Sequence, residues 1–384
     1  MIQVDIASLD FKTTDRVKGY LQQLVDKGGS DLHLKAEGKI RARIKGEITT
    51  LSEDIFSRGD ALTLSKEVLR GRFGIFVEEK QIDFTFSLND DYRFRGNFFF
   101  QKDGVSAVFR VIPSDIKSLS ALDLPLALDK LTSLHRGIVL VTGATGSGKS
   151  TTLAALIDAI NNYQKKHIIT IEDPIEFIHK DKQSMINQRS IGEDAISFAS
   201  ALKGALREDP DVILVGEMRD LESIEMALHA AETGHLVLST LHTIDAKETL
   251  NRIIGMFPPH EQDRIRLTLA STLEGVVSQR LVKNNSGSRK AVIELLLKTP
   301  RLEELIRKRR DDEITEVLEE GKDIYGTQSF DQALLEMVKN GAITNDVALQ
   351  SATSPDNLKL KLSELDKKNS DTDTEGDSVI GLKK

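Results

Sequence analysis

Cysteine is missing from all 384 residues of the sequence. This absence excludes disulfide bonds and cysteine-ligated zinc, and it is typical of a protein kept in a reducing cytosol. No apolar run approaches the roughly 20 residues that a membrane-spanning helix needs. The opening residues, MIQVDIASLDFKTTDR, lack the basic-then-apolar pattern of a secretory signal. We therefore expect a soluble, cytoplasmic protein without membrane insertion.

An excess of positive charge is also missing, because the formal net charge is −8. A protein whose main partner is nucleic acid is usually basic, so we expect no nucleic-acid partner. The length favours two domains rather than one, and the 39% hydrophobic content is enough for a normal buried core.

Residues 1–113 are expected to form a small α+β domain, because turn residues separate short strand-like runs. The predicted helices are 17–27 and 58–70, and the predicted strands are 31–34, 40–44, 84–88, 92–100 and 105–112. Arginines alternate with phenylalanines along the last two strands, at Arg93, Arg95 and Arg110. These arginines either face water or meet a phosphate across a domain or subunit boundary.

The segment 143–150, GATGSGKS, has the spacing G-x-x-x-x-G-K-S between an apolar run and a helical pattern. A strand, a glycine-rich turn and a helix in this order predict a loop that binds the phosphates of a nucleoside triphosphate. Lys149 would reach the β- and γ-phosphates, and the Ser150 hydroxyl would bind Mg²⁺. The other loop residues expected to contact the nucleotide are Gly143, Thr145, Gly146, Ser147, Gly148 and Thr151.

After a linker at 114–122, strongly apolar runs alternate with helical sequence at 138–141, 168–171, 212–215 and 236–240. This alternation predicts an α/β domain over 123–362 with a mostly parallel sheet. Ligands bind at the carboxyl ends of such strands. Each of the four runs delivers a polar group there: the phosphate loop, Glu172, Glu217 and His242.

Glu217 closes an apolar run in the manner of a Walker B acid, which holds Mg²⁺ or orients and deprotonates the attacking water. Glu172, with Asp173 and Glu176 beside it, forms a second acidic cluster that calls for a cation such as Mg²⁺. His242 is a candidate sensor of the γ-phosphate, and His235, at the other end of the same strand, is a further candidate nucleotide contact. The alternative is that either histidine is a structural hydrogen bonder.

The rest of the chain is predicted to be mainly helical, with helices at 246–254, 259–282, 299–319 and 330–340. Four basic residues at 307–310 are followed by three acidic ones, so we expect a solvated, self-compensating face there. The polar composition of 363–384 predicts a disordered tail.

With these pieces in place, the chain resembles the secretion ATPases, and among them the type IV pilus retraction motors of the PilT/PilU family. The resemblance spans about residues 30–360 and includes SDLHL, GATGSGKSTTLAALID, HIITIEDPIEFIH, AAETGHLVLSTLHT and VVSQRLV in the family's order. It implies a PAS-like N-terminal domain, a RecA-like ATPase domain and a homohexameric ring. It also implies that Glu217 is the general base and that Arg95 and Arg110 reach toward the nucleotide.

The resemblance therefore implies an ATPase that uses Mg²⁺ and ATP to retract pili, docked on an inner-membrane platform protein. The segment 301–308, RLEELIRK, departs from the AIRNLIRE motif of the main branch, and YGTQSFDQAL at 325–334 favours the PilU-like branch. A partner of the PilT type is then expected. Two alternatives stay open: a nucleotide-gated regulatory subunit with weak turnover, and a RecA-like DNA translocase.

Overall fold

The computed structural model describes residues 4–5, 9–89, 91–113 and 115–376. The chain divides into two compact units. The N-terminal unit comprises Met1–Asp115 together with Glu176–His179, and the C-terminal unit comprises Ile116–Ile175 and Lys180–Lys384. Each unit has its own hydrophobic core.

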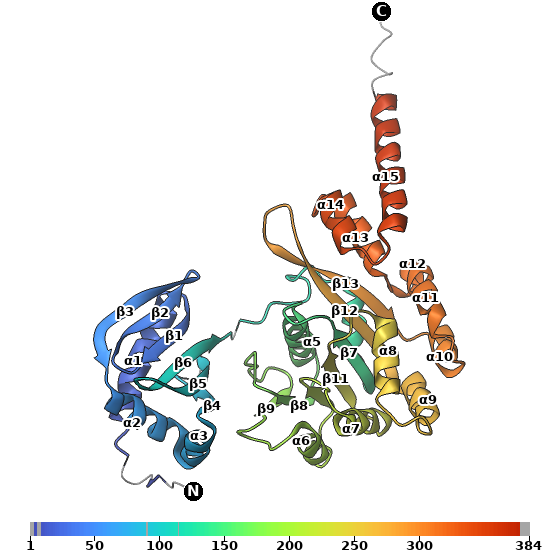
Figure 1. Ribbon diagram of the computed structural model, residues 1–384. Helices are drawn as coiled ribbons and strands as arrows, with labels where there is room; N and C mark the ends of the chain where they lie inside the picture. Colours follow the sequence, from blue (N-terminus) through green and yellow to red (C-terminus); the bar gives the residue numbers. More distant parts are fainter. Residues whose placement is uncertain (1–3, 6–8, 90, 114, 377–384) are drawn as a thin grey trace, which may run out of the picture. The chain divides into compact units, whose positions relative to one another are not determined.

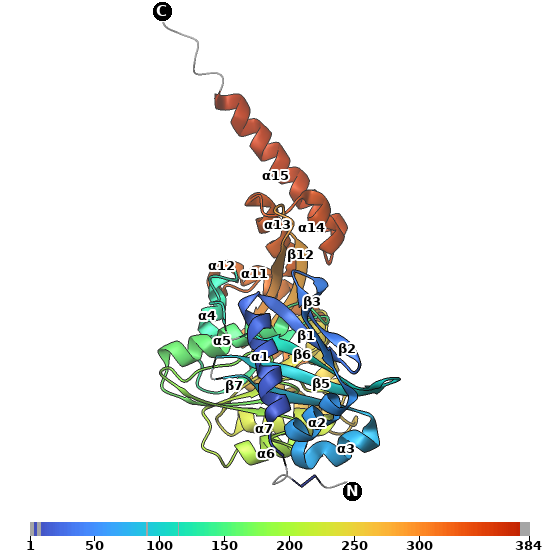
Figure 2. The same ribbon diagram turned by 90° about the vertical axis from the view of Figure 1, so that its left-hand side faces the viewer.

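The N-terminal unit is built on a six-stranded antiparallel sheet with the order β3-β2-β1-β6-β5-β4. Its strands are β1 (Gly29–Lys35), β2 (Gly38–Ile44), β3 (Glu47–Phe56), β4 (Gln81–Ser87), β5 (Arg93–Gln101) and β6 (Gly104–Ile112). Its helices are α1 (Lys12–Asp26), α2 (Arg58–Leu69) and α3 (Phe73–Glu79), with the 3₁₀ turn η2 (Arg70–Arg72). The helices pack on one face of the sheet (Figure 2).

Alternation along β5 and β6 decides which face is covered. Phe94, Phe98 and Phe109 are fully buried under the helices, where they pack against further phenylalanines. Arg95 and Arg110 point to the other face and stay partly exposed. The sequence predicted this division from the two-residue period, and the burial pattern of β5 confirms it.

The C-terminal unit contains a seven-stranded sheet with the order β13-β12-β7-β11-β10-β8-β9. Its strands are β7 (Gly137–Thr142), β8 (His167–Glu172), β9 (Met185–Ser190), β10 (Val212–Val215), β11 (Leu236–Leu241), β12 (Leu273–Lys283) and β13 (Arg289–Leu297). All neighbours pair in parallel except β12 and β13, which pair antiparallel. The predicted α/β fold with a mostly parallel sheet is confirmed (Figure 1).

Helices cover both faces of this sheet, which is why its central strands are apolar throughout. One face packs against α6 (Phe198–Ala205), α7 (Leu221–Glu232), α8 (Ala246–Gly255), α9 (Gln262–Thr272) and α10 (Pro300–Arg307). The other face packs against η3 (Leu126–Leu128), α4 (Asp129–Thr132) and α5 (Lys149–Tyr163). The chain then continues through η4 (Asp311–Glu313), α11 (Ile314–Glu320), α12 (Lys322–Tyr325), α13 (Phe330–Lys339), α14 (Asn345–Ser351) and α15 (Pro355–Gly376).

Helices α13 to α15 share a small core with the β12–β13 ribbon. Val282 and Val292 on the ribbon pack against Phe330 and Leu334 on α13 and Leu358 on α15. The two faces of the ribbon therefore serve different parts of the unit. One face packs toward α5 and the other toward the C-terminal helices.

Two helix predictions were wrong in part. The helix expected over 259–282 ends at Thr272, and the chain continues directly as β12. The residues of β12 are almost all buried between β7 and β13, a setting in which branched apolar residues favour a strand over a helix. The helix expected over 299–319 is interrupted after Arg307, and Arg309 adopts a left-handed backbone conformation with φ 59°. The elements that were not predicted include β3, α3, β9 and α14.

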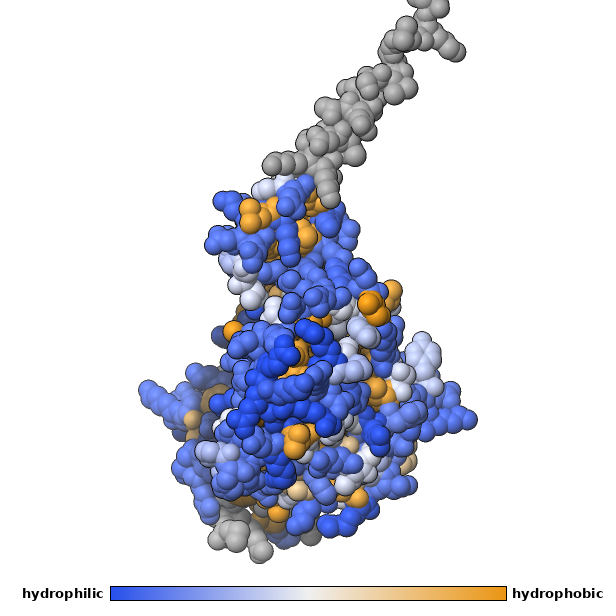
Figure 3. Space-filling view, turned by 90° about the vertical axis from the view of Figure 1, so that its right-hand side faces the viewer, coloured by the Kyte–Doolittle hydropathy of each residue, from blue (hydrophilic) through white to orange (hydrophobic). Residues whose placement is uncertain are grey.

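The basic run lies where α10 ends, and each of its members has an acidic partner. Arg307 and Lys308 pair with Glu303 and Glu304 one turn earlier, Arg309 pairs with Asp263, and Arg310 pairs with Glu313. The predicted compensation of charge is confirmed, but only Arg310 pairs with one of the three acids that follow the run, and the other partners lie in α10 and α9. On the side of the molecule where α9 and α10 lie, hydrophilic residues predominate and hydrophobic residues form separate spots (Figure 3).

Helix α15 covers the first part of the segment for which the composition predicts disorder, and the remainder of that prediction, 377–384, lies outside the described residues. Among the helices that are described, none combines the length and the apolar character needed to cross a membrane.

Candidate nucleotide site

The segment 143–150 joins the end of β7 to the start of α5, as the sequence predicts. Three of its glycines have positive φ angles: 139° at Gly143, 79° at Gly146 and 92° at Gly148. Residues with a side chain rarely adopt these conformations, so the glycines set the path of the loop. Lys149 is buried, and its Nζ donates hydrogen bonds to the carbonyl oxygens of Gly143 at 2.8 Å and Ala144 at 3.0 Å.

A buried hydroxyl in this loop fits a phosphate ligand. Ser147 Oγ is buried and has no hydrogen-bond partner among the described residues. A hydroxyl is both a donor and an acceptor, and burying it without a partner is costly. A phosphate oxygen could accept its hydrogen. Thr145 and Gly146, at the tip of the loop, are exposed, while Ser150 and Thr151 in the first turn of α5 are half-buried.

The four predicted strands end at one edge of the sheet. Thr142 at the end of β7 lies opposite Leu241 at the end of β11. Val215 on β10 is paired both with Ser239 on β11 and with Ile171 on β8. The residues that follow, among them Glu172, Glu217 and His242, therefore leave the sheet on the same side as the phosphate loop. The predicted convergence is confirmed, while the chemical role of each residue stays a prediction.

Glu217 and His242 come together at this edge. His242 Nε2 lies 3.6 Å from Glu217 Oε2, and Arg219 NH2 forms an ion pair with the other carboxylate oxygen at 2.7 Å. The Glu217 side chain is only 15% exposed, whereas Arg219 is 71% exposed. A sheltered carboxylate between a histidine and an arginine can accept a proton from water while its charge is balanced.

Glu172 ends β8 beside β9. Its Oε1 accepts hydrogen bonds from Thr170 Oγ1 at 2.6 Å and from Gln188 Nε2 at 3.2 Å. Asp173, the next residue, is exposed, and Glu176 groups with the N-terminal unit.

The donor set at this edge suits magnesium. Within the described part of the chain, no three His, Cys, Asp or Glu side chains gather closely enough to hold a metal ion by themselves. Mg²⁺ is normally held by one or two protein oxygens together with substrate phosphates and water. The Ser150 hydroxyl and the carboxylates of Glu217 and Glu172 are oxygen ligands of the kind it prefers.

The other predicted site residues are His235, Arg95 and Arg110. His235 precedes β11, at the opposite end of that strand from His242, and its Nδ1 lies 3.0 Å from the carbonyl oxygen of Ala230. Arg95 and Arg110 belong to the N-terminal unit. Arg110 Nε donates to Asp31 Oδ1 at 2.7 Å, and Arg95 lies 4.0 Å from Asp83. Their contact with nucleotide stays a prediction.

Asp31 is a buried partner for an exposed arginine, since Asp31 is 5% exposed and Arg110 is 68% exposed. Burial by itself raises the pKa of the Asp31 carboxyl, but hydrogen bonds from Ser30 and Arg110 outweigh burial and hold that pKa below its ordinary value. Asp31 therefore keeps its charge and can orient Arg110.

Comparison with known proteins identifies the family. The family described as "Type II/IV secretion system protein" matches residues 12–348. The type IV pilus retraction ATPase PilT of Pseudomonas aeruginosa is 41% identical over 332 residues, which cover 86% of this chain and 96% of that protein. A crystal structure of the pilus retraction motor PilT with bound ADP superposes with a TM-score of 0.82 at 40% identity, covering 89% of this chain and 98% of that one. This chain belongs to the PilT/PilU family of secretion ATPases.

The branch within the PilT/PilU family is not separated by overall identity. The type IV pilus ATPase PilU of Pseudomonas aeruginosa is 40% identical over 347 residues, covering 89% of this chain and 90% of that protein. The difference from the value for PilT is one percentage point. The assignment to the PilU-like branch therefore stays a prediction that is based on the segments 301–308 and 325–334.

Two residues of this PilT/PilU-type site were missed from the sequence. Arg219, which pairs with Glu217, stands only two positions after it, and this short spacing was the available signal. Gln279 contacts the phosphate loop from β12. Gln279 lies more than a hundred residues from the loop in a segment that was predicted to be helical, and the motif VVSQRLV at 276–282, which contains it, was the available signal.

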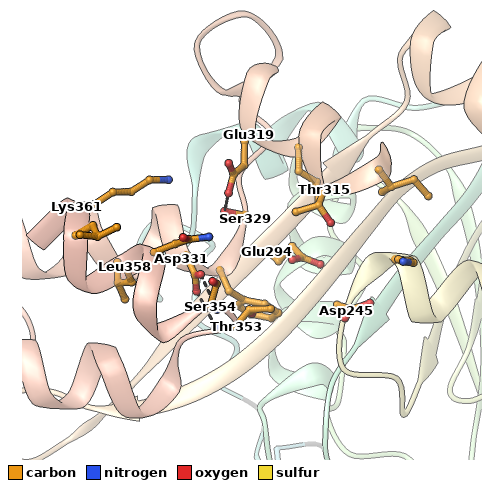
Figure 4. Close-up of a pocket in the computed structure, with 16 residues that line it drawn as sticks. Asp245, Glu294, Thr315, Glu319, Ser329, Asp331, Thr353, Ser354, Leu358 and Lys361 are labelled. Carbon is orange, nitrogen blue, oxygen red and sulfur yellow. Dashed lines mark hydrogen bonds between the residues drawn. The ribbon is translucent and has the colours of Figure 1, made fainter. Parts of the chain in front are cut away.

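A second polar region lies beneath the C-terminal helices, at a cavity of about 410 Å³. Figure 4 shows its labelled residues, which come from the start of α8, from β13 and from helices α11, α13 and α15. Asp245, Glu294, Glu319 and Asp331 bring four carboxylates to it. The cavity lining includes no residue of the phosphate loop, Glu172, Glu217 or His242.

Proposed function

We propose that this chain is an ATP-hydrolysing motor that drives the retraction of type IV pili. The proposal depends above all on one observation: the phosphate loop, Glu172, Glu217 and His242 share the carboxyl edge of one parallel sheet. The name of the PilT structure, a retraction motor with bound ADP, supports the same reading of this edge. Mg²⁺ would be held by Ser150 with Glu217 and Glu172, and it would neutralise charge on the phosphates.

Glu217 would act as the general base and His242 would sense the γ-phosphate. The distance of 3.6 Å between the two side chains supports this pairing, because a movement of either side chain changes its interaction with the other. Arg95 and Arg110 would reach a nucleotide at a boundary between domains or subunits. Their place on the face of the N-terminal sheet opposite its helices supports that role.

The motor is proposed to assemble as a homohexamer and to act at the cytoplasmic face of an inner-membrane platform protein, alone or beside a PilT-type relative. In such a ring, a nucleotide held by two rigid bodies biases their relative orientation, and hydrolysis becomes movement. The names of relatives from both branches refer to type IV pili, which supports a role in pilus movement. Experiment decides between a main and an accessory motor.

Hydrolysis by the purified full chain in Mg²⁺ and ATP tests the proposal. Wild type is expected to release phosphate, and Lys149→Ala is expected to lose both nucleotide binding and turnover, because Lys149 is the cation of the phosphate loop. Lys165→Ala, at an exposed lysine just past the end of α5, is the matched control and should behave as wild type. Sustained turnover in wild type argues against the nucleotide-gated regulatory subunit, for which only weak turnover is expected, and stimulation by DNA would favour the translocase.

Retraction itself requires a cellular assay. Expression of wild type in a piliated bacterium that lacks its own retraction ATPase is expected to restore twitching, and Lys149→Ala is expected not to. Restoration only when a PilT-type relative is present would assign the chain an accessory role.

A further inference from the structure

The side chain of Gln279 lies where β12 passes beneath the phosphate loop. Ser278 is paired with Thr142, the last residue of β7, and their hydroxyls are 3.0 Å apart. Gln279 therefore stands just beyond the point where β7 gives way to the loop. It is 3% exposed, so its amide has to find its partners inside the protein.

Both ends of that amide are engaged by the loop and by the helix that follows it. Gln279 Nε2 donates to the carbonyl oxygen of Ser147 at 2.7 Å, and Gln279 Oε1 accepts from Thr152 Oγ1 at 2.7 Å. Ser147 precedes Lys149, and Thr152 follows Ser150. One side chain thus binds the backbone of Ser147 and the hydroxyl of Thr152, on either side of the two residues expected to meet the phosphates and Mg²⁺.

Gln279 also lies so close to the loop that two loop positions have no room for a side chain. A Cβ at Gly148 would lie 2.7 Å from Gln279 Nε2, and a Cβ at Gly143 would lie 2.3 Å from the Gln279 carbonyl oxygen. Side-chain carbons do not approach other atoms so closely. At both positions glycine is therefore required for two reasons: the close contact with β12 and the positive φ angle.

The bond to Ser147 sets the direction of a backbone N–H group. In a trans peptide the C=O and N–H groups point in opposite directions. Because the Ser147 carbonyl points at Gln279, the N–H of Gly148 points away from β12. Loops of this type bind phosphate through N–H groups directed in this way.

We propose that Gln279 is a positioning residue of the nucleotide site, which holds the phosphate loop in its binding conformation through its bonds to Ser147 and Thr152. It acts through the loop and does not touch the reacting atoms. The inference rests on the proposed function, since it assumes that the loop binds the phosphates of ATP and ADP.

The test is titration of the full chain with ADP and Mg²⁺, with steady-state hydrolysis measured beside it. Gln279→Met keeps the length of the side chain and removes both hydrogen bonds, and it is expected to weaken ADP binding about tenfold. Thr152→Val removes only the bond to Oε1 and is expected to weaken ADP binding about threefold. The double variant is expected to be no weaker than Gln279→Met alone, because the Thr152 hydroxyl has already lost its partner.

Thr272→Val is the matched control. Thr272 Oγ1 donates to the carbonyl oxygen of Thr268 at 2.8 Å and is equally buried, but it lies at the end of α9. Its loss should lower the melting temperature as Thr152→Val does and leave ADP binding unchanged. A merely structural role for Gln279 would make both kinds of variant alike.

Two results would overturn the proposal: wild-type ADP affinity in folded Gln279→Met, or additive losses in the double variant. If Gln279→Met fails to fold, Thr152→Val decides alone, and wild-type affinity in that variant counts against the proposal. Failure of the proposed function is distinguishable, because it is measured on wild type: wild type would then bind no ADP, or would bind ADP without the expected hydrolysis, whatever the Gln279 variants do.

Discussion

Acidic side chains gather at two places in the C-terminal unit, and they find different kinds of partner there. At the carboxyl edge of the sheet, Glu172 accepts hydrogen bonds from Thr170 and Gln188, and Glu217 contacts Arg219 and His242. All of these partners are side chains. They can change rotamer when a ligand arrives.

At the cavity beneath the C-terminal helices, the partners are mostly backbone N–H groups at helix starts. Glu294 accepts a hydrogen bond from the backbone N–H of Ala246, the first residue of α8, and lines the cavity beside Phe330, the first residue of α13. Asp331 accepts from Thr353 and Ser354, just before α15 (Figure 4). Helix N-termini attract negative charge, so Asp331 stabilises a junction of helices, and Glu294 contributes to the same junction as a hydrogen-bond acceptor.

The kind of partner, more than the number of acids, therefore separates a reactive cluster from a structural one. Carboxylates bonded to fixed backbone groups have little freedom to take up a metal ion or a proton during a reaction. Carboxylates held by movable side chains retain that freedom. If this comparison is right, substitutions at the two places should alter different properties of the protein.

Glu217→Gln should produce the largest effect. The amide keeps the shape of the side chain but cannot accept a proton, so hydrolysis should fall by about 10²- to 10⁴-fold, the usual contribution of a general base. ATP binding should persist, because the phosphate loop is untouched. Phosphate release and ATP titration measure the two effects separately, and Glu222→Gln, at an exposed acid in the first turn of α7, is the control. Normal turnover in Glu217→Gln would remove Glu217 from catalysis.

Glu294→Gln should change how stability depends on pH and should leave catalysis in place. Burial raises the pKa of Glu294 to about 7 from an ordinary 4.5 and outweighs the hydrogen bond from Ala246. The folded state thus binds this proton more tightly than the unfolded state. The contribution of Glu294 to stability is greatest below pH 4.5 and is lost as the pH rises through 7, by on the order of 3 kcal/mol.

Urea unfolding of wild type and Glu294→Gln across this range measures the difference. The free energy of unfolding of wild type should fall more steeply with rising pH than that of Glu294→Gln. Glu319→Gln, at a less buried acid of the same cavity, should keep the wild-type slope. Parallel curves for wild type and Glu294→Gln would show that Glu294 titrates as an ordinary carboxyl.

The two places also differ in how far sequence alone could predict them. The carboxyl edge was predictable because each of its groups directly follows an apolar strand, so local order along the chain reports position in space. The junction of helices was not predictable in this way. Glu294 accepts a hydrogen bond from a residue about fifty positions before it and lines one cavity with a residue about thirty-five positions after it, and no local pattern indicates either neighbour.

The same reason explains the errors in the fold. The segment of β12 has apolar residues at spacings that suit a helix, and only pairing with β7 and β13 makes it a strand. Because of that error the contact between Gln279 and the loop was not predicted, since a helix over 259–282 does not place Gln279 beside the loop. Tertiary pairing overrode local propensity there, while in β7 and β11 the two agreed.

Arg280→Ala should have the smallest effect and should test whether the two regions are independent. Gln279 and Arg280 are consecutive on β12, so their side chains point to opposite faces. The Arg280 guanidinium carbon lies 3.8 Å from the centroid of the Phe330 ring, and its NH1 donates to the carbonyl oxygen of Ser351 at 2.9 Å. Loss of these contacts should loosen α13 and α14 by about 1–2 kcal/mol.

Hydrogen exchange over residues 330–351, measured with and without ADP, detects that change. Faster exchange with unchanged ADP affinity is the expected outcome for Arg280→Ala, and Arg289→Ala, at the exposed start of β13, is the control. A loss of ADP affinity as large as that of Gln279→Met would contradict it. Because only β12 lies between the two side chains, such a loss would mean that the strand transmits strain from the C-terminal helices to the phosphate loop, and the two acidic regions would then belong to one coupled device.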